Sequence, residues 1–150
     1  MKKAALLLAA ILLLMHPAAA ACLVTGEAYG VGAAAAIVME AESGEVLFAQ
    51  EIHRQLPMAS TTKIMTLILA LENANPDDIV MISDYAASMP DVQLHLRAGE
   101  HYRLGDLLYS MMLESHNDSA VAIAEHVAGT VPAFAVLMNA KARDIGCYDT

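Results

Sequence analysis

Hydrophobic positions spaced three and four residues apart predict four helices after residue 59. The stretches are residues 60–71, 104–114, 119–128 and 131–145. Their apolar residues recur at helical spacing, which indicates packing against a core. The first stretch is apolar nearly all round, which implies that this helix is buried. Glycines follow the last two stretches, at the place where a residue with positive φ commonly ends a helix.

Shorter apolar runs predict β-strands. Residues 33–40 and 46–49 flank a turn sequence that contains Gly44, so they are expected to form a hairpin. Residues 79–82 and 92–96 are expected to be two further short strands. Because two strands alone rarely form a stable sheet, the hairpin is expected to pair with strands from elsewhere in the protein.

The N-terminus has the pattern of a secretory signal peptide. Lys2 and Lys3 precede an apolar run over residues 4–15, and small residues follow at 18–21. The apolar run is short for a membrane span, so residues 1–21 are predicted to be removed and the mature protein to be exported to the periplasm or the outer face of the membrane. An uncleaved N-terminal anchor is the alternative interpretation.

The two cysteines do not predict a metal site or a disulfide framework. Cys22 stands where a lipobox cysteine would, but Ala19 occupies the position at which lipoboxes usually have leucine, which favours ordinary cleavage. Cys147 lies far away in the sequence, and no spacing supports a disulfide between the two. The six histidines are scattered and are interpreted as surface or packing residues, so no metal is expected.

The charge of the chain excludes one class of partner. The formal net charge is -9, and removal of Lys2 and Lys3 with the signal peptide takes it to about -11. No basic patch is present that could neutralise phosphates. Nucleic acid is therefore not an expected partner.

Ser60 and Lys63 are the first candidates for chemistry. They lie three residues apart at the expected start of a helix, so both side chains share one face. Serine becomes a good nucleophile when a neighbouring base takes its proton, and lysine can be that base when burial lowers its pKa. The alternative is structural: Ser60 as an ordinary N-cap and Lys63 as a solvated or snorkelling lysine.

A second polar cluster, Glu114-Ser115-His116-Asn117-Asp118, interrupts the apolar helices. Ser115 could relay a proton to a leaving group, and the amide of Asn117 could position the lysine and a substrate carbonyl. The structural alternative is a capping box formed by Ser115 and Asp118.

The order S-x-x-K and then S-x-N resembles the penicillin-binding protein and serine β-lactamase superfamily. The surrounding sequence, AAAAIVMEAESGEVLFAQ at 33–50, LPMASTTKIMT at 56–66 and LRAGEHYRLGDLLYSMMLESHNDSAVAIAEHVAG at 96–129, is similar to the low-molecular-weight D-alanyl-D-alanine carboxypeptidases of peptidase family S11. The resemblance implies an α/β fold of the β-lactamase/DD-peptidase type, in which helices and a helical subdomain accompany an antiparallel sheet.

The resemblance also implies a function and a role for each site residue. Ser60 would attack the terminal D-Ala-D-Ala bond of a peptidoglycan stem peptide, Lys63 would be the general base, and Ser115 would relay the proton. Asn117 would bind substrate, and β-lactams would acylate Ser60. No cofactor is implied, and membrane attachment would involve a segment beyond residue 150.

Two departures from the family pattern are evident. His116 stands where the family usually has glycine or alanine, with its side chain expected to point away from the nucleophile. The K-T-G motif, which the family carries on a later strand, is absent from the 150 residues. Residues 22–150 are therefore interpreted as the N-terminal portion of the catalytic domain, lacking the C-terminal strands and expected to be inactive alone.

Two other functions are compatible with parts of the pattern. A class A-like serine β-lactamase would share the first motif, but that class favours S-D-N where this chain has Ser115-His116-Asn117. A non-catalytic peptidoglycan-binding homologue would have no need of a serine and a buried lysine in one helical turn.

Overall fold

The structure, a computed structural model, describes residues 31–148, which fall into two compact units that divide between Arg54 and Gln55. The predicted signal peptide (1–21) and Cys22 lie outside the described residues. Cys147, near the other end, is exposed and has no disulfide partner within residues 31–148.

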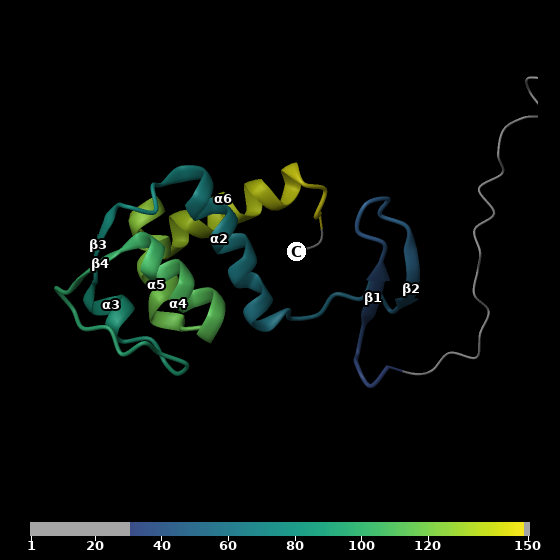
Figure 1. The fold of residues 1–150 in the computed structure, drawn as a ribbon, viewed down its shortest axis with the longest axis horizontal. Helices are drawn as coiled ribbons and strands as arrows, with labels where there is room; N and C mark the ends of the chain where they lie inside the picture. Colours follow the sequence, from purple (N-terminus) through teal and green to yellow (C-terminus); the bar gives the residue numbers. More distant parts are fainter. Residues whose placement is uncertain (1–30, 149–150) are drawn as a thin grey trace, which may run out of the picture. The chain divides into compact units, whose positions relative to one another are not determined.

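The first unit contains the predicted hairpin (Figure 1). Strands β1 (Ala36–Met39) and β2 (Val46–Gln50) pair antiparallel. Gly44 in the turn has a φ of 72°, a conformation that glycine adopts without strain. The Glu40 carboxylate accepts hydrogen bonds from the side chain and backbone of Ser43, and these bonds lower the pKa of Glu40 to about 2. The hairpin prediction is confirmed, with β1 starting three residues later than expected.

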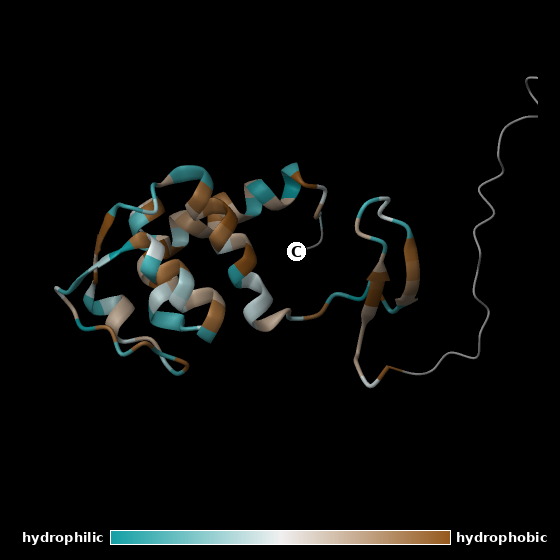
Figure 2. Cartoon of the chain, viewed as in Figure 1, coloured by the Kyte–Doolittle hydropathy of each residue, from teal (hydrophilic) through white to brown (hydrophobic). Residues whose placement is uncertain are grey.

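The second unit is built around helix α5 (Asn117–Ala128), which packs against α2 (Thr62–Asn73), α4 (Leu104–Glu114) and α6 (Val131–Asp144) (Figure 1). The core of this unit is apolar, and its most deeply buried large apolar side chains are Val80, Ile82, Leu104, Leu107, Met111 and Ile123. The four helices predicted from periodicity are therefore present. Helices α2, α4 and α5 share one apolar cluster, and α2, α5 and α6 share a second, smaller one. Figure 2 shows the apolar stretches along these helices.

The helix boundaries differ slightly from the predicted ones. The helix expected to start at about Ser60 begins with a 3-10 turn, η1 (Ala59–Thr61), and the α-helical part starts at Thr62. Helix α5 starts at Asn117 instead of Ser119. The polar cluster is consequently shorter than the sequence suggested, and Asn117 already belongs to α5.

The strand predicted at 92–96 is wrong. Strand β3 (Ile79–Met81) is present, but its antiparallel partner is β4 (His101–Arg103). Residues 92–96 are an irregular segment in which backbone N–H groups of Leu94 and Leu96 donate to the carboxylate of Asp118. These backbone groups therefore bond to a side chain, whereas the apolar pattern predicted bonds to a neighbouring strand.

A short helix, α3 (Asp84–Ala87), was not predicted. Its N-cap is Ser83, whose hydroxyl accepts from the backbone N–H of Ala86 and donates to the carboxylate of Glu125 on α5. The capping serine therefore also fastens this small helix to the central one.

Within residues 31–148, no single helix is long and apolar enough to cross a membrane. Helices α5 and α6 reach that length and apolarity only when taken together across an 82° bend.

Candidate active site

Ser60 lies in the 3-10 turn that leads into α2. Ala59, directly before it, has a φ of 47°, and the hydroxyl of Thr61 donates to the carbonyl of Met58 at 2.6 Å. The N-cap of α2 is Thr61 and that of the 3-10 turn is Met58, so Ser60 is not a helix cap. Ser60 is exposed and lines an open cavity of about 350 Å³.

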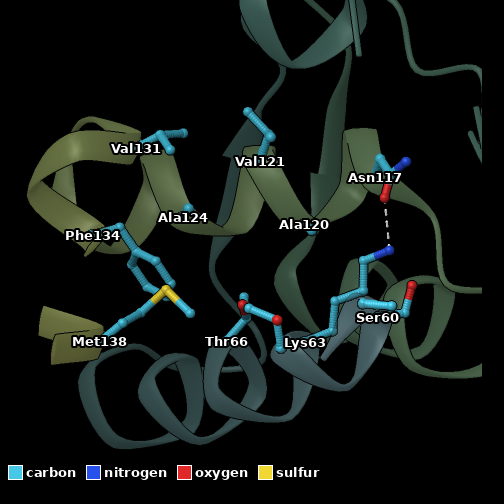
Figure 3. Close-up of a pocket in the computed structure, with 12 residues that line it drawn as sticks. Ser60, Lys63, Thr66, Asn117, Ala120, Val121, Ala124, Val131, Phe134 and Met138 are labelled. Carbon is cyan, nitrogen blue, oxygen red and sulfur yellow. Dashed lines mark hydrogen bonds between the residues drawn. The ribbon is translucent and has the colours of Figure 1, made fainter. Parts of the chain in front are cut away.

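Lys63 is buried beside Ser60 in the same cavity, with only 9% of its surface exposed. Its ammonium donates to the Oδ1 atom of Asn117 at 2.8 Å, to the Oγ atom of Ser115 at 3.0 Å and to the backbone carbonyl of Ser115. Figure 3 shows the amine turned toward Asn117. Lys63 is thus neither solvated nor snorkelling, and none of these three hydrogen bonds goes to Ser60.

The surroundings of Lys63 lower its pKa. Burial lowers the pKa of the Lys63 ammonium from its ordinary value of 10.5, and the negative charge of Asp118 opposes part of this effect. A neutral amine would keep two N–H donors and gain a lone pair that can accept a proton. Burial therefore makes Lys63 a better candidate base than an exposed lysine.

Ser115 and His116 form the whole connection between α4 and α5. Ser115 is the C-cap of α4 in the left-handed conformation, with φ 62° and ψ 31°. His116, the N-cap of α5, makes no side-chain cap bond, so the capping box proposed for Ser115 and Asp118 does not form. The tight turn instead presents Ser115 to Lys63.

Asn117 joins Lys63 to a third segment of the chain. Its amide nitrogen donates to the carbonyls of Pro90 and Asp91 at 3.1 and 3.0 Å, and its backbone N–H donates to the carbonyl of Val92 at 2.7 Å. The carbonyl oxygen of the amide is left to accept from Lys63. These bonds fix which end of the amide faces the amine.

Asp118 is a site residue whose role the sequence did not reveal. Its side chain is 1% exposed, and its carboxylate accepts from the backbone N–H groups of Leu94, Leu96 and Ser119. The available signal in the sequence was an acidic residue at the start of an otherwise apolar helix. Because that residue fitted a capping box, the sequence pattern assigned Asp118 no contact with distant residues.

The cavity has a polar end and an apolar end (Figure 3). Ser60, Lys63 and Asn117 lie at one end, and Phe134 and Met138 from α6 lie at the other. The His116 side chain does not line the cavity and contacts Ser110 on α4. Residues 31–148 contain no cluster of three or more His, Cys, Asp or Glu side chains that could hold a metal ion.

The sequence model of the D-alanyl-D-alanine carboxypeptidase family, Peptidase_S11, matches residues 23–150. The chain belongs to this family. Among its relatives, the carboxypeptidase DacF of Bacillus subtilis is 35% identical over 123 residues, which cover 79% of this chain and 32% of the relative. DacC of Escherichia coli is 33% identical over 137 residues, covering 84% of this chain and 34% of the relative.

Solved structures of the carboxypeptidase family agree with the fold. The carboxypeptidase DacD from Francisella tularensis superposes with a TM-score of 0.77 at 33% identity, over 81% of this chain and 30% of that one. Penicillin-binding protein 5 from Haemophilus influenzae superposes with a TM-score of 0.75 at 29% identity, over 81% of this chain and 38% of that one. The predicted DD-peptidase fold of helices and antiparallel strands is therefore confirmed. The chain spans about a third of the length of these relatives.

Proposed function

We propose that this chain forms part of a serine-type D-Ala-D-Ala carboxypeptidase that removes the terminal D-alanine from peptidoglycan stem peptides. The observation that carries the proposal is the buried amine of Lys63, which lies in one cavity with Ser60 and is bonded to Ser115 and Asn117. Membership of the carboxypeptidase family supports the substrate class.

In the first half of the reaction, neutral Lys63 takes the proton of the Ser60 hydroxyl as Oγ attacks the carbonyl carbon of the terminal peptide bond. The backbone N–H of Ser60 donates to the oxygen that becomes negative, a contribution worth about 3 kcal/mol for one such donor. The proton then passes from Lys63 through the Ser115 hydroxyl to the nitrogen of the departing D-alanine. The C–N bond breaks, and the peptide remains as an ester on Ser60.

In the second half, water attacks the ester carbonyl and gives a proton to Lys63, and Lys63 passes that proton to the Ser60 oxygen as the ester bond breaks. Asn117 orients Lys63 and binds the substrate amide throughout. A β-lactam would acylate Ser60 by the same first half of the reaction and remain attached to it as a covalent adduct. By the family resemblance, the substrate carboxylate would bind a K-T-G motif, which these 150 residues do not contain.

The proposal includes a place of action. The sequence pattern of residues 1–21 supports export, and the substrate is a cell-wall peptide, so the protein would act in the cell envelope.

The test is release of D-alanine from a peptide ending in D-Ala-D-Ala by the whole protein that contains this chain. Ser60→Ala is expected to abolish release, and Lys63→Ala to reduce it by about 10²–10⁴-fold, the usual contribution of a general base. His101→Ala, a change at an exposed residue of β4, is the control and should leave release unchanged. Release that survives in Ser60→Ala would contradict the proposal, and rapid penicillin hydrolysis would assign the protein to the β-lactamases.

A further inference from the structure

A chain of three polar side chains lies behind the active-site turn. The Nδ1 atom of His116 is 2.7 Å from the Oγ atom of Ser110, and that oxygen is 2.9 Å from the Oγ atom of Ser119. Ser110 belongs to the last turn but one of α4, and Ser119 to the first turn of α5. The three groups therefore connect the turn to both helices that it joins.

The connection satisfies the hydrogen-bonding needs of a buried group. The Ser119 residue has no exposed surface, and its hydroxyl is paired with Ser110. The Ser110 hydroxyl has one proton and can also accept, so it bonds to Ser119 on one side and His116 on the other in either tautomer of the neutral ring. A buried hydroxyl without a partner is unfavourable, so Ser110 is held in place and gives the imidazole a fixed anchor.

The turn anchored by His116 has an unfavourable backbone conformation, and the hydrogen bonds of Lys63 depend on its position. Ser115 has a left-handed backbone conformation, which is unfavourable for a residue with a side chain. Two of the three hydrogen bonds of Lys63 go to Ser115, and the third goes to Asn117. A small rotation of the turn would therefore displace both partners of the amine at once.

The other side chains of the turn do not tie it to α4. Among the hydrogen bonds of the described residues, the Ser115 side chain bonds to Lys63, and the Asn117 side chain bonds to Lys63 and to the segment at 90–91. The His116 side chain alone reaches back to α4. A histidine at this position was the departure from the family pattern that the site chemistry left unexplained.

We propose that His116 is a positioning residue, whose imidazole, anchored on Ser110 and Ser119, holds the turn so that Ser115 and Asn117 meet the Lys63 amine. The proposal rests on the proposed function, because it concerns the placement of groups that act in that reaction. His116 itself does not touch the reacting atoms.

The test measures how fast a fluorescent penicillin acylates the whole protein, per active site. His116→Ala and Ser110→Ala are each expected to slow acylation by about 3- to 10-fold, the effect of one lost hydrogen bond on the transition state. The double variant should be little slower than either single variant, because both changes break the same connection. His101→Ala is the matched control and should acylate at the unchanged rate.

Two further variants separate positioning from a general loss of packing. Asn at 116 carries its amide at the level of Nδ1 and can still bond to Ser110, whereas Gln carries it one carbon further out. We expect His116→Asn to restore most of the acylation rate and His116→Gln to behave like His116→Ala, at similar melting temperatures.

The outcomes distinguish the two proposals. Equal acylation rates in the Ala, Asn and Gln variants and in the unchanged protein would overturn the role of His116 and leave the proposed function intact. An unchanged protein that is not acylated at all would overturn both.

Discussion

Two effects of opposite sign act on the pKa of Lys63. Burial lowers the pKa of its ammonium, and the charge of Asp118 raises it in part. A base must be neutral to act, so the acylation rate should rise with pH as Lys63 loses its proton. Because the pKa is lowered, this rise should lie below the ordinary 10.5 of lysine.

Asp118→Asn removes the charge that raises the pKa of Lys63. The pKa should fall further, and the rise of the acylation rate should move to lower pH. The neutral amide also loses one acceptor for the N–H groups of Leu94 and Leu96, which should destabilise the fold by about 1–3 kcal/mol. A pH profile of penicillin acylation and a thermal melt measure the two effects, and a profile that moves to higher pH would contradict the assignment of Lys63 as the base.

Asn117→Asp should move the same profile in the opposite direction. A carboxylate 2.8 Å from the ammonium favours the charged form, so the pKa of Lys63 should rise and the acylation rate at neutral pH should fall. The carboxylate also cannot donate to the carbonyls of Pro90 and Asp91. If this variant and Asp118→Asn shift the profile the same way, the electrostatic explanation is wrong.

The proximity of the site residues could be anticipated from sequence only in part. The spacing of Ser60 and Lys63 is local, so helix geometry alone places them together. The approach of Ser115 and Asn117 to Lys63, more than 50 residues earlier, came from the family resemblance and not from periodicity. The hydrogen bonds that Asp118 accepts from Leu94 and Leu96 were not predicted, because a carboxylate beside a helix start also fits an ordinary cap.

Helices and strands differed in how well the sequence predicted them. The spacing of apolar residues places α2, α4, α5 and α6 within two residues of their observed starts, because helical hydrogen bonds are local. The pairing of β3 with β4 joins residues 20 to 24 positions apart, and the sequence pattern placed the second strand at 92–96 instead of at His101–Arg103. An apolar run identifies a buried segment, but it does not say whether its backbone bonds to a strand or to a side chain.

Packing at the face between α4 and α5 should account for much of the stability of the second unit. Leu107 has no exposed surface, so Leu107→Ala should lower the free energy of unfolding by about 2–5 kcal/mol. Leu113 lies on the same helix but is 76% exposed, and Leu113→Ala should change stability by no more than about 0.5 kcal/mol. Denaturant unfolding of the whole protein measures both, and equal losses would show that α4 packs differently.

At the scale of the whole molecule, the hairpin exposes several large apolar side chains. Val38 on β1 is 52% exposed and Leu47 on β2 is 56% exposed, and both belong to a sheet of only two strands. We expect residues 22–150 produced alone to be poorly soluble and not to react stably with penicillin. Leu47→Lys should increase the soluble fraction in a sedimentation assay, whereas a soluble and penicillin-labelled 22–150 segment would refute this expectation.

The central claim is that Ser60 is the nucleophile and that the buried Lys63 amine activates it. The most direct measurement is mass spectrometry of the whole protein after reaction with penicillin, with digestion to locate the adduct. The account predicts one penicilloyl group on the peptide that contains Ser60, no adduct in Ser60→Ala, and a greatly slowed adduct in Lys63→Ala. An adduct on any other residue, or an undiminished adduct in Ser60→Ala, would contradict it.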